Sequence, residues 1–178
     1  KSFEQSVQAV RDSLEQDFHR GNSDDKHEGD AFWTHYQQRT GFTGVKTAHG
    51  VAALTQMLGP ERTELRMSLV RRLAESETPD ATRALARSAI FDANGEIRTV
   101  ALAELKRRPQ NHTYDDILMH GIRYPMPDVA HRAAFAIAKL ERKELMPQLA
   151  AFLDQPAPGD PEKKTVNGEE VCEVREVV

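Results

Sequence analysis

Three kinds of residue in this chain of 178 residues could do chemistry: seven histidines, one cysteine and three short clusters of basic residues. The single Cys172 cannot form a disulfide within the chain or build a cysteine metal site alone. Possible metal ligands gather in one polar stretch, at His19, Asp24, Asp25 and His27. Their spacing does not match an EF-hand loop, so a solvated loop is the preferred interpretation. Neither a metal ion nor any other cofactor is expected.

Catalytic motifs are missing from the sequence. It contains no G-x-S-x-G elbow, no P-loop and no dinucleotide fingerprint. Cys172 lies in a Val-rich segment with no histidine that the pattern would place beside it, so we expect a buried, apolar thiol. The sequence therefore favours a protein that is not an enzyme.

The basic clusters are Arg71-Arg72, Lys106-Arg107-Arg108 and the segment 139–143. They could contact nucleic-acid phosphates, which is one alternative function. However, each lies where a helix is expected to end, and the helix dipole favours cations there. Residues 60–143 hold 15 Lys and Arg against 12 Asp and Glu, and the whole chain has a net charge of −4. This balance falls short of a dedicated nucleic-acid binder.

Helical periodicity organises most of the chain. Phe3, Val7, Val10, Leu14 and Phe18 form one apolar stripe, which predicts a helix that ends near residue 21. A second helix is expected from residue 30, and its aromatic residues are expected in the core: Phe32, Trp33 and Tyr36. Further helices are predicted over 45–58, 79–91 and 114–124.

The apolar pattern recurs every 32 residues. Four columns agree in character: Leu65/Ile97/Val129, Leu69/Ala101/Ala133, Val70/Leu102/Ala134 and Leu73/Leu105/Ile137. Offsets of 0, 4, 5 and 8 place them on one helical face, within an arc of about 140°. Helix pairs that repeat with short separators are typical of an α-solenoid, in which each unit buries its apolar stripe against its neighbours.

These units resemble bacterial HEAT-like repeats. The resemblance is carried by Glu64-Leu65-Arg66 and Glu96-Ile97-Arg98, each followed by the small and aliphatic residues of the columns above. The third copy, Asp128-Val129, departs from the pattern because Ala130 stands where the Arg would be. The resemblance covers about residues 45–155. It implies a partner-binding concave surface lined by the second helix of each pair.

The predicted fold class is all-α, a right-handed α-α superhelix of HEAT-like type with a small C-terminal β-hairpin. Residues 1–44 form a helical cap, 45–156 about three helix pairs plus a half repeat, and 157–178 a linker and hairpin tail. Asn167-Gly168 between Val-rich flanks predicts a type I′ turn for this hairpin. No apolar run reaches the roughly 18 residues of a membrane span. Because the chain begins at Lys1 without Met, we expect a piece of a longer protein, and its compartment stays open.

The helix face opposite the apolar columns contains the candidate partner-binding residues. At this face the rows are Met67/Thr99/His131, Ser68/Val100/Arg132, Arg71/Ala103/Phe135 and Glu75/Arg107/Lys139. Apolar residues ringed by arginines are typical of a protein-recognition patch. The candidate residues are therefore Arg71, Val100, Ala103, Arg107, His131, Arg132, Phe135 and Lys139.

The leading hypothesis is a non-enzymatic scaffold that binds a protein or peptide along this face. Three alternatives stay open. Phe135 could be covered by the tail or by a neighbouring helix. The basic helix ends could bind nucleic acid. The chain could also be a regulatory or structural segment of a larger multidomain bacterial protein whose activity lies elsewhere.

Overall fold

A computed structural model of the chain describes residues 2–20, 30–41, 44–109, 112–153, 161–166 and 169–174. Most of these residues are helical, and the body of the protein is all-α. The chain divides into two compact units, Lys1–Tyr114 and Asp115–Val178. Within the described ranges, no helix is long and apolar enough to cross a membrane.

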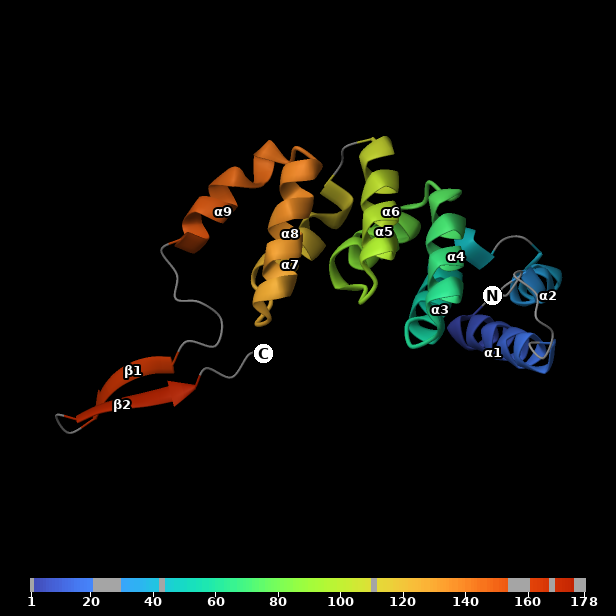
Figure 1. The fold of residues 1–178 in the computed structure, drawn as a ribbon, viewed down its shortest axis with the longest axis horizontal. Coiled ribbons are helices and arrows are strands. Elements are labelled where there is room, and N and C mark those ends of the chain that lie inside the picture. The colour runs from blue at the N-terminus through green and yellow to red at the C-terminus, as the bar shows by residue number, and fades with distance from the viewer. Residues whose placement is uncertain are drawn as a thin grey trace. The chain divides into compact units, whose positions relative to one another are not determined.

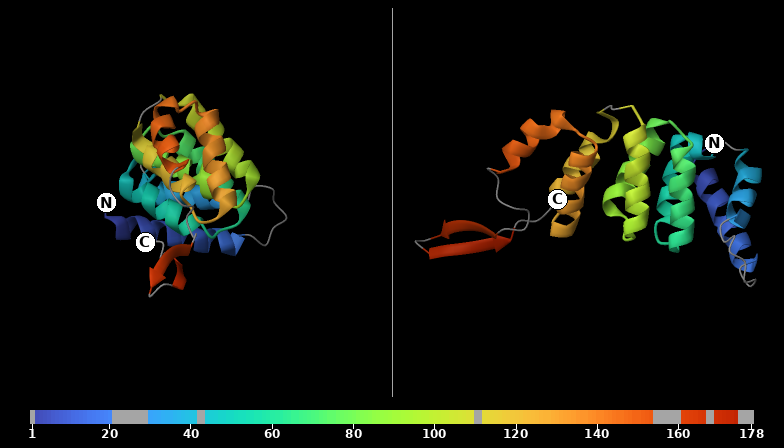
Figure 2. Two further views of the ribbon diagram at one scale, coloured as in Figure 1. Left: turned by 90° about the vertical axis from the view of Figure 1, so that its left-hand side faces the viewer. Right: turned by 45° about the horizontal axis from the view of Figure 1, so that its top comes forward.

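The first unit is a series of helices that pack in sequence order (Figures 1 and 2). Its elements are α1 Phe3–Arg20, α2 Asp30–Thr40, η1 Gly44–Lys46, α3 Ala48–Leu58, α4 Thr63–Ala74, α5 Pro79–Phe91, α6 Gly95–Arg107 and η2 His112–Tyr114. Helix α1 packs against both α2 and α3, and α5 packs along α6. The unit therefore joins the expected N-terminal helices to the first repeated ones.

The second unit contains the antiparallel helix pair α7 and α8, followed by shorter elements. Its elements are α7 Asp115–Ile122, α8 Pro127–Lys139, η3 Lys143–Leu145, α9 Met146–Leu153, β1 Pro161–Val166 and β2 Glu169–Val174. The two strands pair antiparallel, with Val166 opposite Glu169. The expected turn at Asn167-Gly168 lies outside the described residues, as does the side chain of Cys172.

Local side chains explain where several helices begin. Thr47 caps α3, and its hydroxyl accepts a hydrogen bond from the Gly50 amide. Thr78 caps α5 in the same way ahead of Pro79, which lies in the first turn. Asn94 caps α6 by accepting from two amides. Such caps satisfy amides that have no partner within their own helix, and Pro suits the first turn because it lacks an amide proton.

Three of the four predicted columns are buried in every repeat. All nine residues of the columns that begin with Leu65, Leu69 and Leu73 are buried. The burial predicted for the remaining column, which begins with Val70, was wrong in part. Val70 is buried, Leu102 is half-buried and Ala134 is exposed. This column lies at the edge of the apolar arc, about 140° from the first. Its burial therefore depends on what covers the flank of each helix.

Two arginines at equivalent positions of successive repeats meet at one turn. Arg66 of α4 donates through Nε (3.1 Å) and Nη2 (3.2 Å) to the two carboxylate oxygens of Asp92, which follows α5. Arg98 of α6 donates to the backbone oxygens of Asp92 and Ala93, both at 2.8 Å. A bidentate Arg–carboxylate pair has defined geometry as well as charge. It fixes the α5–α6 turn against α4, whereas Ala130 offers no such side chain in α8.

Arg108, just after α6, connects this helix to the end of α4. Its Nη2 donates to the backbone oxygens of Leu73 (2.7 Å) and Ser76 (2.7 Å), and its Nη1 donates to the Thr82 hydroxyl. The last carbonyls of a helix have no partner within that helix, so a guanidinium there satisfies several acceptors at once. Burial lowers the pKa of Arg108, opposed by the nearby Glu77 and Glu104 carboxylates.

Arg108→Ala is expected to destabilise the first unit by about 2 to 4 kcal/mol, because it leaves half-buried carbonyl oxygens without a donor. Urea unfolding followed by circular dichroism measures this loss. Arg107→Ala is the matched control: its side chain is 74% exposed and pairs with Glu104 on the surface, so the loss should stay below about 0.5 kcal/mol. Equal losses in the two variants would contradict the role given to Arg108.

Candidate functional site

The candidate residues of the first unit lie on α4 and α6. Arg71, Ala103 and Arg107 are exposed, and Val100 is half-buried. Arg107 pairs through Nη1 with a Glu104 carboxylate oxygen at 2.6 Å. These side chains present a mixed polar and small apolar surface rather than a large apolar patch.

The candidate residues of the second unit lie on α8, where His131, Phe135 and Lys139 are exposed and Arg132 is half-buried. The Phe135 side chain is 53% exposed. Nζ of Lys139 lies 5.4 Å from the centroid of its ring, which is cation–π geometry. An aromatic ring with a cation beside it is therefore presented on the surface of α8.

The outer face predicted for α4 was wrong at Met67, which is only 9% exposed. The neighbouring Ser68 is half-buried, and its hydroxyl oxygen accepts a hydrogen bond from Nε1 of Trp33 at 2.8 Å. Trp33 belongs to α2, so the N-terminal helices cover part of the α4 surface that the repeat pattern assigns to solvent. A periodicity argument cannot detect this cover, because it comes from residues more than 30 positions away.

The aromatic residues of α2 form a cluster, which confirms that they belong to the core. Phe32, Trp33 and Tyr36 are all buried. The Phe32 ring meets Trp33 edge-on at 4.9 Å and stacks on Tyr36 at 5.8 Å between centroids. Such pairs stabilise by about 0.5 to 1.5 kcal/mol beyond their buried area.

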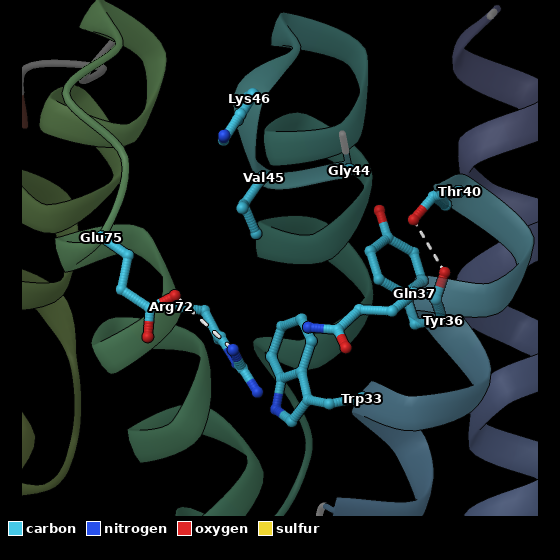
Figure 3. Close-up of a pocket in the computed structure, with 9 residues that line it drawn as sticks. All are labelled: Trp33, Tyr36, Gln37, Thr40, Gly44, Val45, Lys46, Arg72 and Glu75. Carbon is cyan, nitrogen blue, oxygen red and sulfur yellow. Dashed lines mark hydrogen bonds and ion pairs between the residues drawn. The ribbon is translucent and has the colours of Figure 1, made fainter. Parts of the chain in front are cut away.

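One edge of this cluster forms the wall of a hollow of about 240 Å³ between α2, η1 and α4 (Figure 3). The lining residues are Trp33, Tyr36, Gln37, Thr40, Gly44, Val45, Lys46, Arg72 and Glu75. Figure 3 shows Arg72 and Glu75 on one side and Tyr36, Gln37 and Thr40 on the other, with Val45 and Lys46 across from Trp33. The hollow thus combines the edge of a buried aromatic cluster with charged groups.

The charges at this hollow are two cations and one carboxylate. The guanidinium carbon of Arg72 lies 5.6 Å from the Trp33 ring centroid. Arg72 also pairs with Glu75, but the contact is long at 3.5 Å and Glu75 is 63% exposed. Lys46 is exposed at the opposite side. A surface pair of this length contributes little, so Glu75 does not hold Arg72 strongly.

The Tyr36 hydroxyl is buried without a hydrogen-bond partner. Gly44 packs directly against it, since a Cβ built on Gly44 would lie 2.5 Å from the hydroxyl oxygen. Burial raises the pKa of Tyr36 to about 12, because the phenolate would lose its hydration. The sequence carried a signal for this wall in the spacing of Trp33 and Tyr36, but nothing that placed Gly44 or Arg72 beside them.

Two arginines of the basic clusters bind other groups within the chain. Arg108 caps α4 as described, and Arg142 is 1% exposed. Arg142 pairs with Asp115 at 2.5 Å and with the Glu144 carboxylate. Cations engaged in this way do not project outward as phosphate contacts.

The possible metal ligands Asp24, Asp25 and His27 lie outside the described residues, as does the His19 side chain. Where the structure describes side chains, no group of three or more His, Cys, Asp or Glu residues is placed to hold a metal ion.

Comparison of the chain with protein-family models, with curated proteins and with solved structures finds no match.

Tyr36→Phe is expected to stabilise the protein by about 1 kcal/mol, because it removes a buried hydroxyl that has no partner. The melting temperature should rise by about 2 to 4 °C. Thermal unfolding at pH 8 measures the change. A variant that melts several degrees lower would show that the hydroxyl has a bond that stabilises the fold.

The same variant should alter the response to high pH. Because the folded pKa of Tyr36 is raised from 10.0 to about 12, its contribution to stability is complete below pH 10 and is lost as pH rises through 12. About 1 kcal/mol is lost by pH 11. Urea unfolding at pH 8 and pH 11 should therefore show the advantage of Tyr36→Phe over the native chain growing by that amount. An unchanged difference would contradict the raised pKa.

Gly44→Ala should destabilise the first unit by about 1 to 3 kcal/mol, since the new methyl group overlaps the Tyr36 ring. Gly95→Ala is the matched control. Its Cβ would meet only the flexible Arg98 guanidinium, at 3.3 Å, in the first turn of α6. This control should be neutral or stabilising by up to about 1 kcal/mol. Urea unfolding of both variants tests the packing of η1 on α2.

Proposed function

We propose that this chain is a non-enzymatic binding module that holds a protein or peptide on the outward face of its second helices, with α8 as the main contact. The observation that carries the proposal is the exposure of Phe135 together with its small apolar neighbours Ala134 and Ala138. Positions 131, 134, 135, 138 and 139 share one face of the helix, at 100° per residue. This face places an apolar strip between His131 and Lys139.

A strip of this kind has the composition found at the centre of protein–protein interfaces. Large aromatic side chains in the middle of a patch, with cations at its rim, are enriched where proteins bind each other. Lys139 lies over the Phe135 ring and holds a cation next to the apolar group. A partner with an apolar side chain flanked by a carboxylate matches this arrangement.

We propose further that the helix pairs belong to a right-handed α-solenoid of HEAT-like repeats. Support comes from the 32-residue recurrence and from the three columns that are buried in every copy. On this proposal Arg71, Val100, Ala103 and Arg107 are contact residues of the first unit. The type I′ turn of the C-terminal hairpin is likewise a proposal, supported by the pairing of β1 with β2.

Phe135→Glu is expected to lower partner capture about tenfold or more, because loss of one central aromatic anchor typically costs at least 1.4 kcal/mol. The measurement is quantitative capture of proteins from a cell extract by the immobilised chain. Circular dichroism and melting should stay unchanged, since the ring is half-exposed.

Met146→Glu is the matched control for this experiment. Met146 is 57% exposed in the same unit but belongs to another helix, α9. Proteins lost with Phe135→Glu and retained with Met146→Glu support the α8 face. If both variants keep the same captured proteins as the native chain, the face is assigned wrongly. Arg71→Glu then tests, by the same readout, whether α4 also contacts captured proteins.

A further inference from the structure

The hollow between α2, η1 and α4 has the composition of a small binding site of its own. Its volume of about 240 Å³ is below the range of drug-sized pockets, which begin at about 300 Å³. A group of this size corresponds to one amino-acid residue rather than to a nucleotide or an extended peptide.

The walls define two kinds of contact. Val45 and the narrow exposed edge of Trp33, which is 4% exposed, offer apolar surface, whereas Arg72, Lys46 and Gln37 offer hydrogen-bond donors. In Figure 3 the Gln37 side chain extends from α2 towards the Trp33 ring, and Arg72 lies beside the same ring. A ligand that contacts the exposed edge of Trp33 would therefore also meet these donors.

The balance of charge favours a single negative charge on the ligand. Arg72 and Lys46 face one carboxylate, Glu75, so the lining carries a net charge of +1. The Arg72–Glu75 contact is long and exposed, so a ligand carboxylate can take the place of Glu75 on the guanidinium. A doubly charged phosphate would leave an excess negative charge next to Glu75.

We propose that this hollow binds an α-carboxylate that carries an apolar side chain, as found in a free amino acid or at the C-terminal residue of a peptide. The carboxylate binds Arg72, with Gln37 as a further donor, and the side chain packs on Val45 and the exposed edge of Trp33. In a free amino acid, the ammonium group would pair with Glu75. The site does not depend on the α8 face.

The chain provides its own reporter for the test, because Trp33 is its only tryptophan. Its indole N–H, which donates to Ser68, contributes one resonance to a ¹⁵N–¹H correlation spectrum of the full chain. The probes are leucine, N-acetyl-leucine and leucinamide. Leucine or N-acetyl-leucine should shift the resonance with a dissociation constant of about 1 mM, as expected for a ligand with so few atoms. Leucinamide should shift it at least tenfold more weakly.

The two sources of the carboxylate are distinguished by the first two probes. Tighter binding of leucine identifies a free amino acid, and tighter binding of N-acetyl-leucine identifies a peptide C-terminus. Equal binding of leucinamide, or equal binding of inorganic phosphate, would overturn the proposal.

Arg72→Gln should weaken the carboxylate probes about tenfold, whereas Arg71→Gln should leave them unchanged. Arg71 is adjacent in sequence and exposed, but it does not line the hollow. Melting curves verify that both variants fold. An Arg72→Gln variant that binds as tightly as the native chain also overturns the proposal. Phe135→Glu should leave the titration unchanged, so failure of the α8 proposal and failure of this one are separable.

Discussion

The insertion of Arg108 under the end of α4 joins three helices of the first unit, because its guanidinium follows α6 and bonds both the end of α4 and the Thr82 hydroxyl of α5. One guanidinium donates several hydrogen bonds and accepts none, so it can satisfy the last carbonyls of one helix from the end of another. Arg72 and Glu75 lie in the same C-terminal stretch of α4 that Arg108 holds. The contact that joins two repeats therefore also fixes one wall of the hollow. The Arg66–Asp92 pair performs the corresponding task at the start of α4.

The opposite wall of the hollow has another origin. It depends on α2, whose aromatic cluster is buried against its neighbours and carries an unpartnered phenol at its edge. A buried hydroxyl without a partner costs stability, so its retention at a cavity edge marks a place where packing is not optimised for stability alone. The two proposed sites, the α8 strip and the hollow, differ in how they arise. The α8 strip depends on what the surface of one helix exposes, whereas the hollow depends on three elements meeting.

The helices and their inward faces were largely predictable. Leu65, Ile97 and Val129 are buried as their spacing requires, because a helix with one apolar stripe removes that stripe from water by packing it against the core. Positions at the edge of the stripe were not predictable. Ala134 is exposed although Val70, its equivalent, is buried. The arginines show the same limit: the KRR cluster at 106–108 predicts a helix end, but not that Arg107 lies in solvent while Arg108 enters the neighbouring repeat.

The sequence by itself determined the local features: the helix start at Pro79 and the apolar columns that recur every 32 residues. These depend on side chains within a few turns of each other, and helical geometry alone relates them. Only the tertiary structure decided that Trp33 covers Ser68, that Gly44 packs on Tyr36, and that a hollow with a net positive charge lies between them. Those features join residues from separate helices, and their distances follow from how the helices pack rather than from any repeat in the chain.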